Sequence, residues 1–399
     1  MDRPSISRGP QGTMRTSIPW VIARRIVTIP LYGLAFVVLV ATLPLTLPVG
    51  AIIDVFGQKT ALVRFLAFAH LHLACEFGGV IGSGAIRMLC LLPFEDRDRT
   101  KSRLCFALEY LWTRVVAGAG IWLYDLRLEV ESTAIRPDRP VIVMSRHQTA
   151  LDSLFPVYLL THVHGLFVRH VYKRGLLLDP MVDLNGHAVP GYFVDRASGE
   201  PEKEMAAIGD LTRSLEAGEA LSFYPEGTRF TPQKRISILR SLWKKGYHDL
   251  FRRAQELTHV LPPRHGGIQA ILEANPGADV VFCSHHGFEG ISTLWDFLRG
   301  NVLGRTIKIR FWRVPFEAIP RDGNARLDWI HRHWKAVDRF ASIGTDSSVS
   351  RPPCDAADPN KLRKHACHMR ERMSSGPCSM MSMQGEAAEP APASSDADA

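Results

Sequence analysis

Long apolar stretches fill the first third of the chain, and shorter apolar runs alternate with polar segments after it. Residues 26–53 contain no charged side chain and are numerous enough to cross a bilayer as a helix. Residues 65–86 and 104–123 are also apolar, but the former stretch contains two histidines and a glutamate, and the latter a glutamate and an arginine. Such groups are costly in lipid unless they face protein or the interface. We therefore expect the first stretch to be membrane-inserted, the second to return the chain to the cytoplasm, and the third to be an interfacial or packed helix.

The residues around the first apolar stretch indicate its orientation. Arg15, Arg24 and Arg25 precede it, and this favours a cytoplasmic N-terminus. The length of the stretch and the lack of a small-x-small cleavage site disfavour a secretory signal peptide. We expect Pro44 and Pro48 to break the helix near its far end, which leaves a re-entrant or tilted segment open. A soluble domain with three core helices is the remaining alternative.

After residue 124 the pattern changes to short strands with helices between them. Residues 125–131 alternate apolar and polar positions, as a half-buried strand does, and residues 141–144 form a continuous apolar run that suits a strand covered on both faces. Strands that alternate with helices predict a layered α/β domain. The other expected strands cover residues 165–170, 192–195, 220–224, 279–284 and 307–312, and the expected helices cover residues 151–160, 201–217, 267–274 and 325–341.

These patterns divide the chain into four parts. They are a basic tail (1–25), a membrane or interfacial helical region (26–124), an α/β domain with the candidate chemistry (125–345) and a C-terminal tail (346–399). The end of the chain is rich in Ser, Ala, Pro and Glu, so we expect it to be disordered.

Charge and cysteine content narrow the choice of partners. The 399 residues carry a formal net charge of +8, which favours an anionic partner such as nucleic acid, acidic lipid headgroups or a phosphorylated substrate. The sequence shows no basic patch with interleaved aromatics and no zinc-finger spacing, so nucleic acid is not expected. Its seven cysteines are dispersed and include no C-x-x-C pair, which predicts reduced thiols in a cytosol-facing protein.

His147 and Asp152 form an H-x4-D pair between an expected strand and an expected helix. The spacing alone is uninformative, because the chain has 16 histidines and repeats it at His333 and Asp338. Thr149 and Asp152 fit a capping box, so helix capping alone would explain the carboxylate. The same geometry directs the carboxylate toward His147, where it would fix the tautomer and raise the basicity of a general base. The residues by themselves leave capping and catalysis both open.

The sequence F-Y-P-E-G-T-R at residues 223–229 directly follows another expected strand. In α/β folds this end of a strand is where ligands usually bind. Arg229 and the backbone N–H groups around Gly227 suit an anion. An ion pair between Glu226 and Arg229 would explain the same residues without a ligand.

Two further cations are candidates for an anion site. Arg196 ends an expected strand, where pairing with Asp195 is the alternative to ligand binding, and Lys173 is either a ligand or a solvated charge. A metal site is not expected, because no carboxylate or cysteine spacing accompanies His162, His164, His285 and His286. The glycines in residues 78–84 do not match a phosphate-binding loop.

In this order the motifs resemble those of the glycerolipid acyltransferase family, which includes the 1-acylglycerol-3-phosphate acyltransferases. S-R-H-Q-x-x-x-D at 145–152 fits the H-x4-D block, G-Y-F-V-D-R at 191–196 is similar to the second block, and residues 223–229 are similar to the third, F-P-E-G-T-R, with one extra tyrosine. V-L-P at 260–262 ends as the fourth block does. The P-R-H-G-G that follows looks closest to the lysophospholipid and lysocardiolipin branch, with His265 in place of its threonine. The resemblance covers about residues 126–341.

The resemblance implies a central mixed sheet flanked by helices, and a membrane enzyme that transfers a fatty acyl group from acyl-CoA or acyl carrier protein to the hydroxyl of a lysophospholipid. The first expected acceptor is 1-acylglycerol-3-phosphate, which would give phosphatidic acid. His147 would be the base and Asp152 its partner, without an acyl-enzyme, and N–H groups near Gly227 would stabilise the oxyanion. The residues expected to contact substrate are Lys173, Arg196, Glu226, Gly227, Thr228, Arg229 and Pro262.

Further expectations concern cofactors and location. No metal or redox cofactor is expected, and the acyl donor is a co-substrate. The expected location is a phospholipid membrane, with the catalytic domain facing the cytoplasm and a bacterial inner membrane favoured. Three alternatives stay open: another lysolipid acceptor such as lysophosphatidylinositol or lysocardiolipin, a non-catalytic membrane adaptor of the same fold, and a metal-dependent hydrolase. The intact His147, Asp152, Glu226 and Arg229 count against the adaptor.

Overall fold

The computed structural model describes residues 18–346, except 58–59, 134, 150 and 292. All helices and strands described below belong to one compact unit within Met1–Ser347. The expected disorder of the C-terminal tail concerns residues 347–399, which lie outside the described residues, as does most of the expected basic tail.

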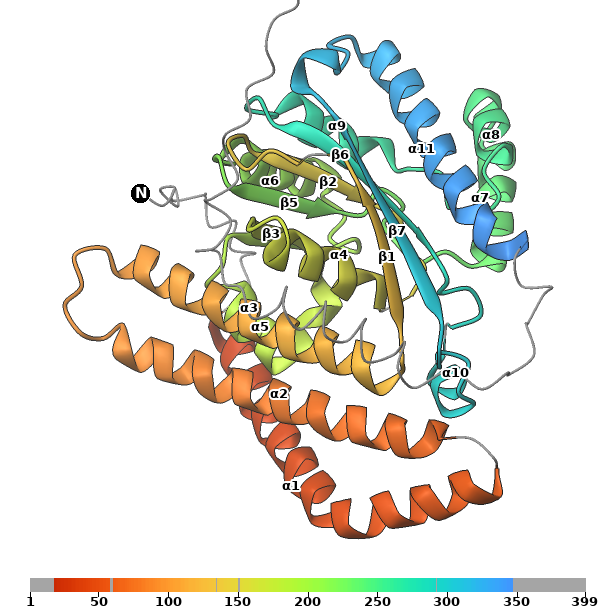
Figure 1. The fold of residues 1–399 in the computed structure, drawn as a ribbon. Helices are drawn as coiled ribbons and strands as arrows, with labels where there is room; N and C mark the ends of the chain where they lie inside the picture. The colour runs from red at the N-terminus through yellow and green to blue at the C-terminus, as the bar shows by residue number, and fades with distance from the viewer. Residues whose placement is uncertain (1–17, 58–59, 134, 150, 292, 347–399) are drawn as a thin grey trace, which may run out of the picture. The chain divides into compact units, whose positions relative to one another are not determined.

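Three long helices come first in the chain: α1 (Ile18–Phe56), α2 (Ala61–Leu89) and α3 (Arg97–Leu123) (Figure 1). Each is long and apolar enough to cross a membrane. The apolar stretch of α1 has a mean hydropathy of 2.4 with none of it buried, whereas those of α2 and α3 reach 1.4 and 1.3 with 22% and 28% buried. The most apolar and least buried of the three helices is therefore the one that was expected to insert into the membrane. The third stretch, expected to be interfacial or packed, does pack against the following helix, α4 (Leu151–His162).

Proline does not end the first helix. The helix α1 continues through Pro44 and Pro48 to Phe56, so the expected break at these prolines was wrong. Figure 1 shows a sharp bend in α1 instead. An interior proline removes one backbone hydrogen bond, and a helix absorbs this as a kink when the residues beyond it continue the helical path. Just before the end of α1, the Asp54 carboxylate accepts the backbone N–H groups of Leu62 and Val63 at 3.0 and 2.8 Å, which caps the start of α2.

A seven-stranded sheet forms the centre of the α/β domain. Its strand order is β1-β7-β6-β2-β5-β3-β4, with β6 and β7 antiparallel and the other neighbours parallel. The prediction of a mixed sheet flanked by helices is therefore confirmed. The strands are β1 (Arg127–Ser132), β2 (Val141–Ser145), β3 (Phe167–Lys173), β4 (Gly191–Val194), β5 (Glu219–Phe223), β6 (Asp279–His286) and β7 (Thr306–Val314).

Helices cover both faces of this sheet and bury one apolar core on each (Figure 1). One core joins the sheet to α6, α9 and α11 and contains the fully buried Trp334, while the other joins it to α3 and α4 through Ala117 and Phe155. Every residue of β2, β5 and β6 is buried, which explains the continuous apolar runs at residues 141–144 and 280–283. The bounds of the helices not yet given are α6 (Pro201–Arg213), α9 (His265–Glu273), α10 (Leu294–Leu298) and α11 (Gly323–Asp346).

Short helices also occur where the sequence pattern predicted none. They are the 3-10 helices η1 (Arg174–Leu178) and η2 (Phe316–Ala318) and the α-helices α5 (Pro180–Gly186), α7 (Pro232–Lys244), α8 (His248–Gln255) and α10. The start of α7 follows a common rule, since Thr231 caps it by accepting the N–H of Lys234 at 3.2 Å and Pro232 occupies the first turn. No residue of α7 is buried, but Ile236, Leu239 and Trp243 recur at helical spacing, so the sequence did contain a signal for this helix.

Candidate active site

The candidate residues gather at one edge of the sheet. His147 follows β2, the 226–229 segment follows β5, Lys173 ends β3 and Arg196 follows β4. These four strands are adjacent and mutually parallel, so their carboxyl ends meet at the same edge. Ligands of open α/β sheets bind at this edge.

His147 and Asp152 are in direct contact. His147 Nδ1 lies 2.9 Å from Asp152 Oδ1, and the carboxylate is fully buried while the imidazole is 20% exposed. In the tautomer that donates from Nδ1 to the carboxylate, the other nitrogen, Nε2, is free to accept a proton. The pair therefore has the arrangement that a general base requires.

The same carboxylate also caps α4. Asp152 Oδ2 accepts the backbone N–H groups of Gln148 and, at 2.6 Å, of Thr149, while Thr149 Oγ1 accepts the Asp152 N–H at 3.3 Å. The expected capping box is therefore present alongside the histidine contact. The two interpretations of Asp152 are compatible, because Oδ1 holds the imidazole and Oδ2 holds the helix start.

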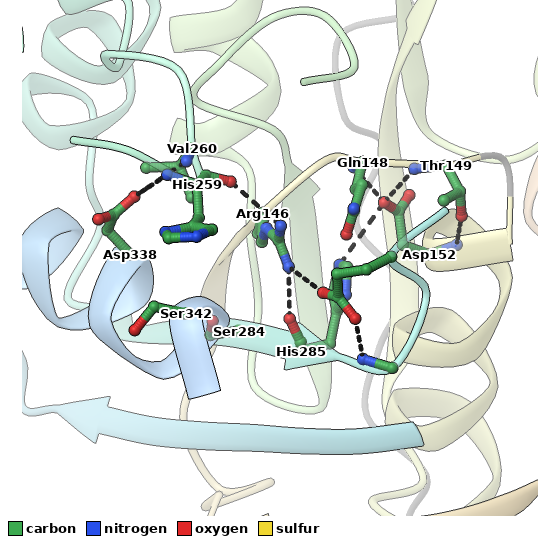
Figure 2. A network of polar contacts seen from close by, with 12 residues as sticks. Arg146, Gln148, Thr149, Asp152, His259, Val260, Ser284, His285, Asp338 and Ser342 are labelled. Carbon is green, nitrogen blue, oxygen red and sulfur yellow. Dashed lines mark hydrogen bonds and ion pairs between the residues drawn. The ribbon is translucent and has the colours of Figure 1, made fainter. Parts of the chain in front are cut away.

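A second histidine approaches Asp152 from β6 (Figure 2). His285 is fully buried, and its Nε2 lies 3.5 Å from Asp152 Oδ2. Burial by itself would raise the pKa of Asp152, but the contacts with His147 and His285 outweigh it and lower that pKa below its ordinary value. The carboxylate is thus kept ionised. The sequence analysis did not identify this role of His285, because nothing local in the sequence links it to Asp152.

Arg146 anchors the segment that carries His147. Its guanidinium is buried and donates to the carbonyl oxygens of His285 at 2.6 Å and His259 at 3.1 Å (Figure 2). It also lies 3.5 Å from Glu289. These contacts tie the turn after β2 to β6 and to the loop before α9.

Glu226 connects three of the sequence motifs, its own and those of His147 and Leu261, by hydrogen bonds. Its Oε1 accepts the backbone N–H of His147 and its Oε2 that of Leu261, both at 2.8 Å, and the residue is 1% exposed. Burial raises the pKa of Glu226 to about 8, although these two donors act in the opposite direction. Within the described residues Glu226 and Arg229 form no ion pair, so that interpretation of the motif was wrong. Glu226 instead fixes the backbone of His147 and of the segment that ends in Pro262.

Of the backbone N–H groups around Gly227, that of Gly227 itself is already used. The Gly227 N–H donates to Tyr224 O at 2.9 Å inside the turn, so it is not available to bind an anion or oxyanion. Glycine is required here for another reason. Its φ is +67°, and an added Cβ would lie 3.0 Å from the Arg264 side chain. The loop then returns to the base, because Phe230 N donates to His147 O at 2.7 Å.

The extra tyrosine of the third block contacts the base. The ring of Tyr224 packs against the His147 imidazole with centroids 4.7 Å apart. Burial, followed by the charge of Asp152, raises the pKa of Tyr224, so the phenol stays neutral. This contact limits the orientations of the imidazole.

Cations surround the open side of the site. Lys234, in the first turn of α7, donates to Thr228 Oγ1 at 2.9 Å and to Arg229 O at 3.0 Å. Burial, and then the charges of Arg229, Lys173 and Arg196, lower the pKa of Lys234. The sequence analysis identified these three cations but not Lys234. Asp195 pairs with Arg174 and not with Arg196, so the expected Asp195–Arg196 pair was wrong.

The site shows no arrangement suited to a metal. Among the described residues no three His, Cys, Asp or Glu side chains are grouped to hold an ion. His285 contacts Asp152, whereas His162 Nε2 lies 3.2 Å from Thr113 Oγ1.

The chain is similar to known acyltransferases. Residues 127–283 match the family model described as Acyltransferase. A curated 1-acyl-sn-glycerol-3-phosphate acyltransferase from Pseudomonas aeruginosa is 28% identical over 170 residues, which span 42% of this chain and 59% of that protein's length. A solved structure, the 1-acyl-sn-glycerophosphate acyltransferase PlsC from Thermotoga maritima, is similar at a TM-score of 0.45 and 14% identity, over 73% of this chain and 98% of that one.

Proposed function

We propose that the protein is a glycerolipid acyltransferase that transfers a fatty acyl group from acyl-CoA or acyl carrier protein to the hydroxyl of 1-acylglycerol-3-phosphate, giving phosphatidic acid. The match of residues 127–283 to the Acyltransferase family model and the similarity to the curated relative support this proposal. The observation that supports this most strongly is the contact between His147 Nδ1 and the buried Asp152 carboxylate, at the sheet edge that also carries the cations. A base beside an anion site suits an acceptor that has both a hydroxyl and a phosphate.

Acyl transfer in this proposal begins with removal of a proton from the acceptor. His147 Nε2 takes the proton of the acceptor hydroxyl, and the oxygen attacks the carbonyl carbon of the thioester. The tetrahedral intermediate collapses, the carbon–sulfur bond breaks, and the thiolate takes the proton back from His147. The products are the ester and the free thiol, and no acyl-enzyme forms. Because the Gly227 N–H is already bonded to Tyr224, other donors must stabilise the oxyanion.

The cations at the sheet edge account for the acceptor phosphate. A phosphate monoester dianion is bound best by several charge-assisted hydrogen bonds. Lys173, Arg196 and Arg229 supply such donors, and Lys234 adds to their field. Thr228 contributes by holding Lys234 in place. Glu226 and Pro262 belong to the scaffold beneath the base.

The three apolar helices account for the lipid chains of acceptor and product. They are long and apolar enough to cross a membrane, which indicates membrane association. We place the catalytic domain on the cytoplasmic side, because Arg24 and Arg25 at the start of α1 contact this domain through Asp183. In a bacterium this location is the inner membrane.

An acceptor panel tests the proposal. Membranes that contain the full chain are assayed with labelled acyl-CoA and, in turn, lysophosphatidic acid, lysophosphatidylinositol, lysocardiolipin and monoacylglycerol. We expect lysophosphatidic acid to give the highest kcat/KM and a chelator to leave the rate unchanged. Preference for another lysolipid would overturn the acceptor assignment. A failure to acylate any lysophospholipid would overturn the function, and activity lost to a chelator would favour a metal-dependent hydrolase.

A further inference from the structure

A cavity of about 360 Å³ lies where the start of α1 meets the ends of β3 and β4. It opens beside two of the proposed phosphate ligands, Lys173 and Arg196. Its other wall comes from the first turns of α1, through Trp20 and Arg24. The helix that carries the strongest membrane signal therefore forms part of a pocket at the catalytic edge of the sheet.

The charge of this cavity is strongly positive. Its cationic lining residues are Arg24, Lys173, Arg174 and Arg196, and its one acidic lining residue is Asp195. Asp195 is already paired with Arg174. The other three cations therefore have no acidic counterpart within the lining, and such a cavity favours an anion with more than one negative charge.

Arg24 lines this cavity and carries hydrogen-bond donors that have no partner. The residue is only 5% exposed, and its NH2 donates to Asp183 Oδ1 at 2.6 Å. Its Nε and NH1 are buried without a hydrogen-bond partner. Asp183 also accepts from Arg25 Nε at 2.8 Å, so one carboxylate faces two guanidinium groups and a positive charge is left over. A buried guanidinium with unpaired donors is costly unless an anion satisfies it.

Apolar residues at the rim suit a lipid more than a free ion. Trp20 is 50% exposed and Leu178 is 61% exposed, and both line the cavity. Tryptophan is favoured at the level of lipid headgroups, because its ring is apolar with one polar group. A ligand with a phosphate at one end and a hydrocarbon chain at the other fits both parts of this site.

We propose that Arg24 of α1 binds the phosphate of the lysophospholipid acceptor together with Lys173 and Arg196. The first membrane helix then contributes directly to acceptor recognition, in addition to anchoring the protein. Asp183 acts as a positioning residue, since it holds Arg24 by one nitrogen and leaves Nε and NH1 without a partner. This inference rests on the proposed function.

Steady-state kinetics of Arg24→Gln in the full-length chain test the inference. Arg25→Gln is the matched control, because Arg25 pairs with the same carboxylate but does not line the cavity. We expect Arg24→Gln to raise the KM for lysophosphatidic acid about 10- to 100-fold, the range for a charge-assisted hydrogen bond, with kcat and the KM for acyl-CoA near wild type. Arg25→Gln should change the KM for lysophosphatidic acid less than about threefold. An unchanged KM in Arg24→Gln, or an equal rise in both variants, would overturn the inference.

Binding of simple phosphates separates this inference from the proposed function. Thermal midpoints of wild type and both variants are measured with and without inorganic phosphate or glycerol 3-phosphate. We expect stabilisation of wild type and of Arg25→Gln but not of Arg24→Gln, whatever acceptor the enzyme acylates. Glycerol 3-phosphate acting at lower concentration than inorganic phosphate would identify the lipid headgroup as the ligand. Equal stabilisation of all three proteins, or of none, would overturn the Arg24 assignment even if lysophosphatidic acid is acylated.

Arg24→Lys keeps the test valid if Arg24→Gln does not fold. Lysine retains the charge beside Asp183, but its single nitrogen cannot reach both the carboxylate and a phosphate with the fork of a guanidinium. We expect a folded protein with a KM for lysophosphatidic acid that is raised about tenfold. A wild-type KM in this variant would contradict a direct contact between Arg24 and the phosphate.

Discussion

The chain contains the H-x4-D spacing twice, and the two copies adopt different structures. In the first copy, His147 precedes α4 and its Nδ1 lies 2.9 Å from the Asp152 carboxylate at the helix start. In the second copy both residues lie within α11. There the His333 ring stacks on a core aromatic ring at 4.6 Å, while the Asp338 carboxylate accepts the backbone N–H groups of residues 258–260.

The difference shows that the spacing has no chemical meaning by itself. Residues five apart on a continuous helix are rotated by about 140° from each other, so their side chains leave on different faces. In the first copy the helix begins between the two residues, at the Thr149 cap, and the carboxylate turns back to the imidazole. The start of α4 between the two residues, and not the interval, brings the imidazole and the carboxylate into contact.

The largest difference in the rate of acyl transfer is expected between substitutions of His147 and of His333. His147→Ala should lower the rate of acyl transfer by about 10²- to 10⁴-fold, the contribution of a positioned general base. His333→Ala should leave the rate within a few-fold and lower the thermal midpoint, because its ring is part of a core aromatic cluster. Initial rates with labelled acyl-CoA at equal amounts of folded protein measure both. Similar losses of rate in the two variants would contradict the different roles of His147 and His333.

Substitution of Asp152 should reduce catalysis, whereas substitution of Asp338 should reduce stability. Asp152→Asn keeps the size of the side chain but no longer stabilises the charged imidazole, so we expect kcat to fall about 10²- to 10³-fold with little change in KM. Asp338→Asn should instead lower the free energy of unfolding by about 1–3 kcal/mol, the cost of a lost buried hydrogen bond. Denaturant unfolding and steady-state kinetics separate the outcomes. A larger catalytic defect in Asp338→Asn would contradict the comparison.

A substitution of His285 tests the surroundings of Asp152, because His285 reaches this carboxylate from β6. His285→Leu should lower kcat about tenfold and raise the pKa of Asp152, which shifts the acid side of the pH–rate profile, since one of the contacts that keep this carboxylate ionised is lost. His285→Gln, which keeps an N–H donor, should recover part of the rate. A change in thermal stability alone, with an unaltered pH profile, would show that His285 has only a packing role.

Substitution of Glu226 is expected to change the rate least. It should instead change how the stability of the protein depends on pH. The pKa of Glu226 rises from 4.5 to about 8 in the folded protein, so the folded state retains a proton there that the unfolded state loses. This contribution to stability is fully present below about pH 4 and is lost as the pH rises through about 8. The thermal midpoint of wild type should therefore fall relative to that of Glu226→Gln across this window. A constant difference between the two proteins would contradict the raised pKa.

Much of the fold could be predicted because its signals are local. The strands β2, β5 and β6 are buried throughout, and apolar residues 141–144 and 280–283 form most of β2 and the centre of β6. The helix α7 was not predicted although apolar residues recur in it at helical spacing, and the kink in α1 was expected to be a helix end.

The site was predictable only where its parts follow one another in sequence. His147 and Asp152 share one turn, and their contact could be anticipated from the cap at Thr149. His285 and Arg24 could not be found this way. Their contacts depend on the pairing of β6 with β2 and on the packing of α1 against α5, which no local pattern encodes.

A double-mutant cycle tests the pair itself most directly. The rates of acyl transfer to lysophosphatidic acid are compared for wild type, His147→Ala, Asp152→Asn and the double variant. If Asp152 acts through the imidazole, the double variant is no slower than His147→Ala, within about threefold, because residues that act as a unit are not additive. A double variant whose loss equals the product of the two single losses would show that the two side chains act independently and would contradict the dyad.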